Sequence, residues 1–427
     1  MKPTEVFDYF CPSTWSRLKA VRIFANATDK ANEGDIQLSA SQKFGVIPQS
    51  KLMEEEDTKY MLALSGTENF KHVQVNDFVI SLRSFEGGFE HSAYDGCVSP
   101  AYTVLRPKIE LHPAFWKHLF KSSIFKDMLA AFNVGVRDGK SIRYDDFSQF
   151  LLAVPRLDVQ KAIATRLDRE TARIDALVEK KTRFIELLRE KRQALITHAV
   201  TKGLDPNVKM KDSGVEWLGE VPEHWVAKKV AYWISTSGSG TTPAKEQDYC
   251  LEEDEGIPWV TTGELRENTI ASTQKYVTAS AITEYSALKV HPVGSLVIAM
   301  YGATVGRLAI LGVPASLNQA CFAIHPCSSI SMEFLRYWIE GFRIELMEMA
   351  TGAGQPNISA DKIRNLVVAA PKSLIEQEKV VDFLIRNTSL IDALIEKTER
   401  SIELLKERRS ALITAAVTGQ IDLREAA

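Results

Sequence analysis

Side chains that can hydrogen-bond to nucleic-acid bases or phosphates lie on loops of this chain that glycines bend. Arg83 and Ser84 follow the apolar run 78–80, and Arg307 follows the apolar run 296–300. An arginine in such a place can bond to guanine or to a phosphate, or its stem can simply cover an aromatic side chain at the surface. The other candidates with base-binding or phosphate-binding groups are Gln42, Lys43, Arg137, Lys140, Thr262, Tyr301, Thr304, Gln355 and Asn357.

Two of these candidates are basic residues of one loop, and a third has a second possible role. Arg137 and Lys140 contribute mainly positive charge, so we expect them to contact phosphates rather than bases. Asn357 can reach a base edge, or it can cap a helix expected at 359–365. The sequence leaves both roles of Asn357 open.

Catalytic and metal-binding chemistry finds little support in the residue pattern. The five cysteines are scattered without a C-x-x-C pair, and the eight histidines show no metal-ligand spacing. The segment Gly135–Ser141 has three residues between its glycines, where a phosphate-binding loop needs four. No Asn/Asp-Pro-Pro-aromatic tetrapeptide is present to hold a flipped adenine. We therefore predict no catalytic residue, no metal site and no cofactor bound by this chain.

The composition predicts a soluble, cytoplasmic protein. The first residues lack an apolar secretory core, and no window approaches 18 uncharged apolar residues. Scattered free cysteines fit a reducing compartment. The formal net charge of −3 is a poor match for a chain that binds DNA alone, because such domains usually present a clearly basic face.

The elements that must position these loops are revealed by an internal repeat. Residues 174–201 return as 391–418, with 20 of 28 positions identical at a constant offset of 217 residues. A repeat of about half the chain length indicates a duplicated unit with an internal pseudo-twofold, the single-chain analogue of a C₂ dimer. Such symmetry suits a target with two halves, and duplex DNA is the commonest such target.

Both copies of the repeat predict a long helix with one apolar seam. Each helix has about 45 residues without glycine or proline, hence roughly 65–70 Å at 1.5 Å per residue. Spacings of four and three define the seam and predict that the helices pack as an antiparallel coiled coil, which would act as a ruler between the globular blocks. Arg192 and Arg409 occupy matching seam positions and either set the register or extend outward past apolar neighbours. The seam residues are Ile174, Val178, Ile185, Leu188, Arg192, Leu195, Ile391, Ile395, Ile402, Leu405, Arg409 and Leu412.

The fold class expected is α+β, with four blocks along the chain. Residues 1–155 and 207–371 are predicted to be similar globular domains of mixed helices and strands, with β-like runs such as 77–82 and 98–105. Residues 156–206 and 372–427 are the central and distal helices. Scaffold positions of the two globular blocks match while their loops differ, so we expect the two blocks to recognise two different targets.

The chain resembles the specificity subunits of type I restriction–modification systems over nearly its whole length. The resemblance lies in residues 77–89, 98–105, 294–311 and 318–320 and in the duplicated helices. The family's Pro-Pro…Glu-Gln opening of each helix is degenerate here, at 155–160 and 371–377. This departure weakens only the placement of the helix starts.

The resemblance implies a DNA-reading scaffold without catalysis of its own. Residues 1–155 and 207–371 would be target-recognition domains, each reading one half of a split, asymmetric site. The helices would set the unread spacer and dock two methyltransferase subunits, which carry S-adenosylmethionine and methylate adenine. Motor-nuclease subunits would add ATP- and Mg-dependent translocation and cleavage, and partners closing around DNA would supply many phosphate contacts.

One further loop becomes a candidate through the resemblance. Residues 237–243 are similar to the family's Gly-Thr-Pro loop, where small residues let a backbone approach DNA, so Ser239 and Thr241 join the DNA-binding candidates. The segment could instead be a flexible linker. The alternative to the whole interpretation is a duplicated coiled-coil interaction scaffold whose terminal domains bind protein or another ligand.

Overall fold

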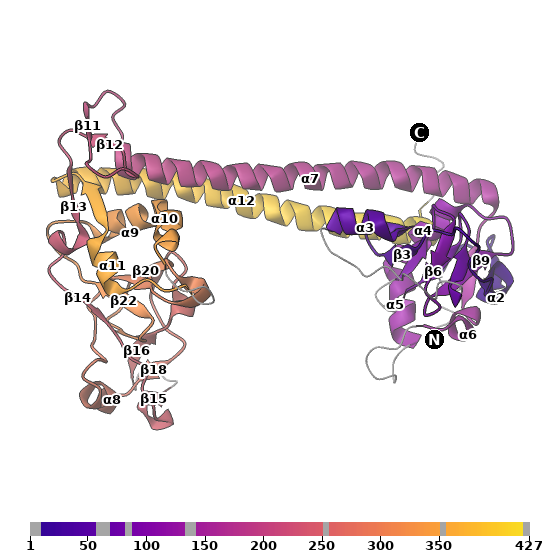
Figure 1. The fold of residues 1–427 in the computed structure, drawn as a ribbon, viewed down its shortest axis with the longest axis horizontal. Helices are drawn as coiled ribbons and strands as arrows, with labels where there is room; N and C mark the ends of the chain where they lie inside the picture. The colour runs from indigo at the N-terminus through magenta and orange to yellow at the C-terminus, as the bar shows by residue number, and fades with distance from the viewer. Residues whose placement is uncertain are drawn as a thin grey trace. The chain divides into compact units, whose positions relative to one another are not determined.

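The computed structural model describes residues 10–56, 69–81, 88–132, 142–250, 256–350 and 356–421 (Figure 1). The chain divides into two compact units. Unit 1 comprises residues 1–182 and 399–427, and unit 2 comprises residues 183–398. The predicted candidates Arg83, Ser84, Arg137, Lys140 and Gln355 lie outside the described residues.

Unit 1 is built on a four-stranded antiparallel sheet of order β2-β9-β6-β7, covered by α4 and α5. Aromatic rings fill its core, where Phe120 lies 5.2 Å from Phe78 and 5.1 Å from Phe89 between ring centroids. The elements of unit 1 ahead of the long helix are β1 (Ser16–Lys19), α2 (Ala20–Ile23), β2 (Phe24–Ala27), β3 (Leu38–Ser41), β4 (Gly45–Pro48), α3 (Gln49–Glu56), β5 (Lys71–Val73), β6 (Phe78–Ile80), β7 (Phe89–His91), β8 (Gly96–Val98), β9 (Thr103–Pro107), α4 (Pro113–Lys121), α5 (Ser123–Phe132), α6 (Tyr144–Ser148) and β10 (Leu151–Val154).

Unit 2 contains a five-stranded mixed sheet, β14-β22-β19-β20-β17, and a four-stranded one, β15-β18-β16-β21. Its elements between the long helices are β11 (Met210–Asp212), β12 (Glu220–Pro222), β13 (Val226–Lys229), η4 (Val230–Tyr232), β14 (Ser237–Ser239), η5 (Glu246–Asp248), β15 (Tyr249–Cys250), β16 (Ile257–Val260), η7 (Thr262–Glu264), β17 (Asn268–Ile270), β18 (Tyr276–Val277), α8 (Ala279–Glu284), β19 (Leu296–Ala299), η8 (Gly302–Thr304), β20 (Leu308–Leu311), β21 (Ser316–Leu317), β22 (Cys321–Ile324), α9 (Met332–Gly341), α10 (Arg343–Glu348), α11 (Ala360–Asn365) and β23 (Val367–Ala370).

The two expected β-like runs of the first block differ in outcome. The run 77–82 contains β6, but the run 98–105 is not one strand. Tyr102 donates its backbone N–H to the Ser99 carbonyl oxygen at 3.0 Å, and this turn separates β8 from β9. Ser99-Pro100 is itself a turn signal, which accounts for the break between the two strands.

The two long helices are α7 (Leu157–Lys202) and α12 (Leu374–Val417), 46 and 44 residues long. Neither range contains glycine or proline, so nothing in the backbone interrupts the ladder of hydrogen bonds. Gly203, directly after α7, and Gly419, two residues after the end of α12, both have positive φ, at 74° and 71°. A left-handed residue directly after a helix is the common way to end it.

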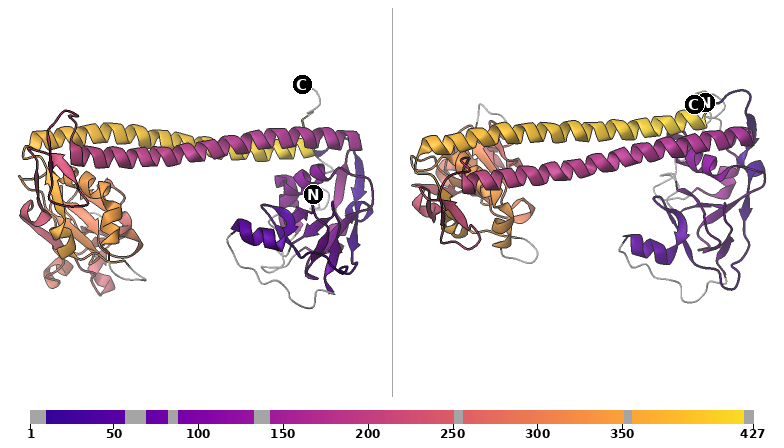
Figure 2. Two further views of the ribbon diagram at one scale, coloured as in Figure 1. Left: turned by 45° about the horizontal axis from the view of Figure 1, so that its top comes forward. Right: turned by 90° about the horizontal axis from the view of Figure 1, so that it is seen from above.

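The helices pack antiparallel within each unit, as predicted. In unit 1 the beginning of α7, with Ile163 and Leu167, shares a buried core with Ile413 and Val417 near the end of α12. In unit 2 the end of α7, Ile196 to Val200, shares a core with Val380 to Leu384 near the beginning of α12. Figure 2 shows these neighbouring helix ends from two further sides. The predicted α+β fold class, with two mixed domains and two long helices, is confirmed.

A buried glutamine fixes the first turn of each long helix to its own unit. Gln160 donates to the Pro155 carbonyl oxygen at 2.9 Å and accepts the His112 backbone N–H at 3.0 Å. Gln377 donates to the Pro371 carbonyl oxygen at 2.8 Å and accepts the Ser331 backbone N–H at 2.7 Å. His112 and Ser331 are the residues that precede α4 and α9. The same clamp therefore occurs twice, 217 residues apart.

Candidate nucleic-acid interface

The residues of the predicted seam are all buried or half-buried in both long helices. Ile174, Ile185, Leu188 and Ile391 are buried, and the other eight seam residues are half-buried. Aspartates 175 and 392, which follow the first seam residue of each helix, are exposed. The alternation of four and three residues thus marks the contact side along both helices.

The two seam arginines form ion pairs across the helix pair. In unit 1 Arg409 binds Asp175 with two hydrogen bonds, from Nε at 2.8 Å and from Nη2 at 3.1 Å. In unit 2 Arg192 Nε lies 2.9 Å from Asp392 Oδ1, and its Nη1 lies 2.6 Å from Glu340 Oε1. Each arginine thus meets the aspartate of the other repeat copy. These directed contacts favour register-setting over side chains that merely extend outward.

Tyr301, Thr304 and Asn357 come together on one side of unit 2. Tyr301 and Asn357 form an isolated antiparallel bridge, and Gly302 donates its N–H to the Pro356 carbonyl oxygen at 3.0 Å. Thr304 Oγ1 lies 3.2 Å from the Tyr301 carbonyl oxygen. The backbones of two loops more than 50 residues apart in sequence, which carry a phenol, a hydroxyl and an amide, are therefore joined at this place. Hydroxyl and amide groups are suited to hydrogen bonds with base edges.

Asn357 does not cap the following helix. The residue before α11 is Ser359, whose hydroxyl accepts the Lys362 backbone N–H at 3.3 Å. Serine and asparagine are about equally good in this position, and only the backbone path decides which one occupies it. The helix-cap alternative for Asn357 is wrong.

Arg307 lies beside an acidic residue that the sequence did not single out. Its Nη1 is 3.9 Å from Glu267 Oε2, and Arg343 Nη1 is 3.2 Å from Glu267 Oε1. Burial raises the pKa of Glu267, while the two arginines and Arg192 act in the opposite direction. Glu267 and Arg343 come from separate segments, so no spacing in the sequence could have connected them with Arg307.

The loop with Ser239 and Thr241 is not a flexible linker. Ser237–Ser239 forms β14, which pairs antiparallel with β22. Gly240 lies so close to Leu317 that an added Cβ would be 1.6 Å from the Leu317 carbonyl oxygen. The glycine is thus required by packing inside unit 2, and Thr241 follows it with its carbonyl oxygen accepting the Trp259 Nε1 proton at 3.2 Å.

Thr262 begins a short turn of helix that its neighbours hold in place. Glu264 Oε2 accepts the Thr261 backbone N–H at 2.7 Å, and Glu264 Oε1 accepts the Gln274 backbone N–H at 2.9 Å. Thr262 itself is half-buried. Its hydroxyl is thereby carried on an ordered turn, as base-reading groups require.

In unit 1 the two described candidates, Gln42 and Lys43, are exposed on the turn between β3 and β4. The Lys43 ammonium lies 4.7 Å from the centre of the Phe44 ring. A lysine in this place presents positive charge to solvent at the tip of a hairpin, as a phosphate contact would require.

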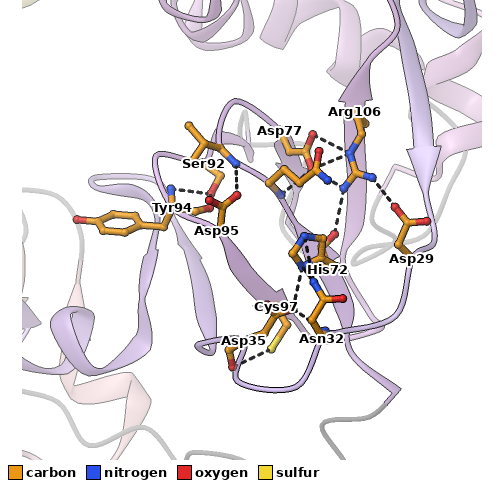
Figure 3. Close-up of polar contacts among 12 residues, drawn as sticks. Asp29, Asn32, Asp35, His72, Asp77, Ser92, Tyr94, Asp95, Cys97 and Arg106 are labelled. Atoms are coloured by element: carbon orange, nitrogen blue, oxygen red, sulfur yellow. Dashed lines mark hydrogen bonds and ion pairs between the residues drawn. The ribbon is translucent and has the colours of Figure 1, made fainter.

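A further basic residue of unit 1, Arg106 on β9, is used inside the domain (Figure 3). Arg106 Nη2 lies 3.0 Å from Asp77 Oδ2, and Nη1 contacts Asp29. Close by, His72 Nδ1 lies 2.8 Å from Asp35 Oδ2. Asp77 is buried, so its charge requires this partner. We interpret the cluster as structural.

Two absences hold for the part of the chain that the structure describes. No helix there has the length and apolar character needed to cross a membrane. No group of three or more histidine, cysteine, aspartate or glutamate side chains there could hold a metal ion.

Comparison with known proteins finds similarity to one family. Residues 226–404 match the model of the type I restriction modification DNA specificity domain. The specificity subunit of the Escherichia coli type I restriction enzyme EcoR124I/EcoR124II is 25% identical over 211 residues, which are 48% of each chain. The corresponding StySPI subunit of Salmonella potsdam is 25% identical over 48% of this chain and 44% of its own length. The EcoKI subunit of E. coli K12 is 21% identical over 82% of this chain and 75% of its own length.

Solved structures show the same fold over almost the whole chain. A chain from a study of complex assembly and conformational transition in a type I R-M system has a TM-score of 0.77 at 15% identity, covering 96% of this chain and 99% of that one. The HsdS subunit of Thermoanaerobacter tengcongensis has a TM-score of 0.59 at 17% identity, with 96% and 98% covered. The matched region spans about half the length of the first two curated relatives.

Proposed function

We propose that this chain, which is similar to type I restriction–modification specificity subunits, is the non-catalytic, sequence-reading subunit of a complex that methylates adenine in DNA. Each unit reads one half of a bipartite, asymmetric site. The observation that carries this proposal is the contrast between the helices and the loops. The helices repeat with 20 of 28 positions identical over residues 174–201, with matching ion pairs at Arg192 and Arg409, while the polar loops of the two units differ.

The polar groups of unit 2 provide the chemistry for reading one half-site. Tyr301, Thr304 and Asn357 lie together and offer hydroxyl and amide hydrogen bonds. Arg307, on the same loop, offers a guanidinium for a phosphate or a guanine. Ser239, Thr241 and Thr262 lie on ordered segments of the same unit. Gln42 and Lys43 are the described candidates of unit 1.

The outer sides of the long helices are suited to partner subunits. On α7 the exposed apolar residues Leu177, Phe184 and Leu187 follow one another at spacings of seven and three, and on α12 Leu390, Leu394 and Leu404 follow at four and ten. These side chains are 41% to 66% exposed. Such a stripe at a/d spacing is the side that a further helix covers in a coiled coil. Leu177 and Leu394, like Leu187 and Leu404, are repeat equivalents, so two copies of one partner fit.

We assign these two positions to two methyltransferase subunits, which bring S-adenosylmethionine and the catalytic residues. Motor-nuclease subunits, with ATP and Mg²⁺, would join the same complex. The number of unread base pairs between the half-sites would follow from the length of α7 and α12. The surface of this chain needs no strong positive charge of its own when partners contribute phosphate contacts.

The test is the pattern of methylated adenine in the source genome with and without this protein. We expect one bipartite sequence to be methylated in both strands and to lose methylation completely when the gene is removed, with recovery on complementation. A complex that forms with a methyltransferase but methylates no unique sequence would contradict the proposal and favour an interaction scaffold. A seven-residue insertion into residues 174–201 should alter the spacer and leave both half-sites unchanged.

A further inference from the structure

Two arginines share one carboxylate beside the loop 301–307 of unit 2. Arg343 Nη1 donates to Glu267 Oε1 at 3.2 Å, and Arg307 Nη1 lies 3.9 Å from Glu267 Oε2. The Glu267 side chain is 21% exposed, whereas Arg343 and Arg307 are 32% and 40% exposed. The cluster thus has one excess positive charge, and its cations are more accessible to solvent than its anion.

The backbone fixes the position of Glu267. Its φ of 57° lies in the left-handed region, which is costly for a residue with a side chain. Its N–H donates to the Leu308 carbonyl oxygen at 2.8 Å, one residue ahead of the parallel pair β17 and β20. Strained backbone of this kind is concentrated at functional sites and persists where the surrounding structure enforces it. The sheet therefore holds this carboxylate at the base of the loop.

The two arginines are held with unequal strength. The Arg343 stem packs on Gly306, with its Cγ 3.5 Å from where a Cβ would lie, and its hydrogen bond to Glu267 is within normal range. The Arg307 contact at 3.9 Å is looser than a hydrogen bond. Arg307 is therefore the arginine that can exchange its partner most easily. It belongs to the loop that also carries Tyr301 and Thr304.

We propose that Glu267 is a gate for Arg307. While the protein is bound to DNA of the wrong sequence, the Glu267 carboxylate keeps the Arg307 guanidinium paired. When the correct half-site lets the loop 301–307 settle against the DNA, a backbone phosphate replaces the carboxylate. Carboxylate and phosphate are both oxyanions that accept from the same guanidinium donors, so they compete for one cation. Glu267 is a positioning residue in this scheme, because it acts through Arg307. This inference rests on the proposed function of unit 2.

The gate predicts a difference between specific and non-specific binding. Each phosphate neutralised by a cation contributes about −0.9 to the slope of log K against log salt concentration for duplex DNA. The wild-type protein should therefore show one phosphate contact fewer on non-specific than on specific DNA at this position. Loss of the carboxylate should remove that difference. Because partly exposed ion pairs are weak, we expect an affinity change of about fivefold.

The experiment compares Glu267→Gln with wild type in the complex of the full chain and its methyltransferase subunits, bound to non-specific duplex DNA over a range of salt. Glutamine keeps the size and backbone of the residue and removes the charge. We expect about fivefold tighter non-specific binding and a slope steeper by about 0.9, with an unchanged slope on the recognised sequence. Glu284→Gln is the matched control, since it removes the same charge from the exposed pair with Lys245 in the same unit.

A second variant separates the gate from a structural effect. In the Arg307→Ala background, Glu267→Gln should leave non-specific binding and its salt slope unchanged, because the cation that it releases is gone. An unchanged slope for Glu267→Gln alone, a change equal to that of Glu284→Gln, or an effect that persists without Arg307 overturns the inference. A wild-type complex that binds no DNA overturns the proposed function together with it.

Discussion

The two units use the same scaffold contact and differ at one charged position next to it. The residues before α4 and α9, His112 and Ser331, each donate their backbone N–H to the equivalent buried glutamine. Nine residues further on, unit 1 has Lys121 and unit 2 has Glu340. Lys121 pairs with the buried Glu90 of β7, whereas Glu340 accepts from Arg192 of α7 at 2.6 Å.

This charge reversal changes what the domain helix is connected to. In unit 2 the pair Arg192–Glu340 connects α9 to the long helix. In unit 1 the Lys121 ammonium instead pairs with Glu90 on the sheet of its own domain. Burial raises the pKa of Glu90, and Lys121 acts to lower it. The repeat-equivalent Arg409 binds Asp175, which is exposed. The comparison teaches that two copies of one helix can carry domains through different electrostatic attachments.

The largest effect should come from the contact that the units share. Gln160→Ala and Gln377→Ala each leave a part-buried N–H and a buried carbonyl oxygen unpaired. Gln160→Ala also removes the acceptor of the Trp116 indole N–H. We expect each variant to destabilise its unit by about 3 kcal/mol. Thermal unfolding, monitored by hydrogen exchange in each unit, would measure this loss of stability. The exposed Gln247→Ala is the control. A marked inequality between the two variants would break the equivalence of the clamps.

The next largest loss of stability should differ between the two units. Arg192→Met keeps the apolar stem but removes one partner of Glu340, which is 7% exposed, and we expect a loss of about 2 kcal/mol with Arg336 as the remaining partner. Arg409→Met leaves an exposed aspartate, so its loss should be under about 1 kcal/mol. Denaturant titration of both variants tests the order, and equal losses would contradict the asymmetric attachment.

The smallest effect on stability should come from the outer side of the helices, where the copies are alike. Leu177→Gln and Leu394→Gln replace exposed side chains, so each should change stability by less than about 0.5 kcal/mol. Each should nevertheless reduce the number of bound methyltransferase subunits from two to one in native mass spectrometry. Two subunits retained by both variants would rule out these leucines as docking residues.

The two long helices could be predicted from the sequence because their signal is local. Periodicity and the absence of glycine and proline gave the extent of α7 and α12, and the matched Arg192 and Arg409 indicated their contact side. Antiparallel packing followed from the order of the blocks. The extent of the helices and their contact side depend on neighbours along the chain, whereas the packing direction depends on the order of the blocks.

The site depended on contacts that spacing does not encode. Glu267 meets Arg307 and Arg343 only through the strand order of unit 2, and Glu340 meets Arg192 from 148 residues away. The pairing of Tyr301 with Asn357 joined two loops that the sequence suggested separately. For Gly240 the sequence indicated small size, but the reason for it, the Leu317 carbonyl oxygen, is a tertiary contact.

The apolar stripes on the outer sides of α7 and α12 have a consequence for the abundance of this protein in the cell. Exposed apolar stripes promote self-association when their partner is absent, and chains that aggregate or are degraded are lost from the active pool. We therefore expect an excess of this subunit over its partner to be unstable in the cell. Under the proposed function, the abundance of this chain would then follow the supply of the methyltransferase subunit, and dosage would be balanced without a dedicated regulator.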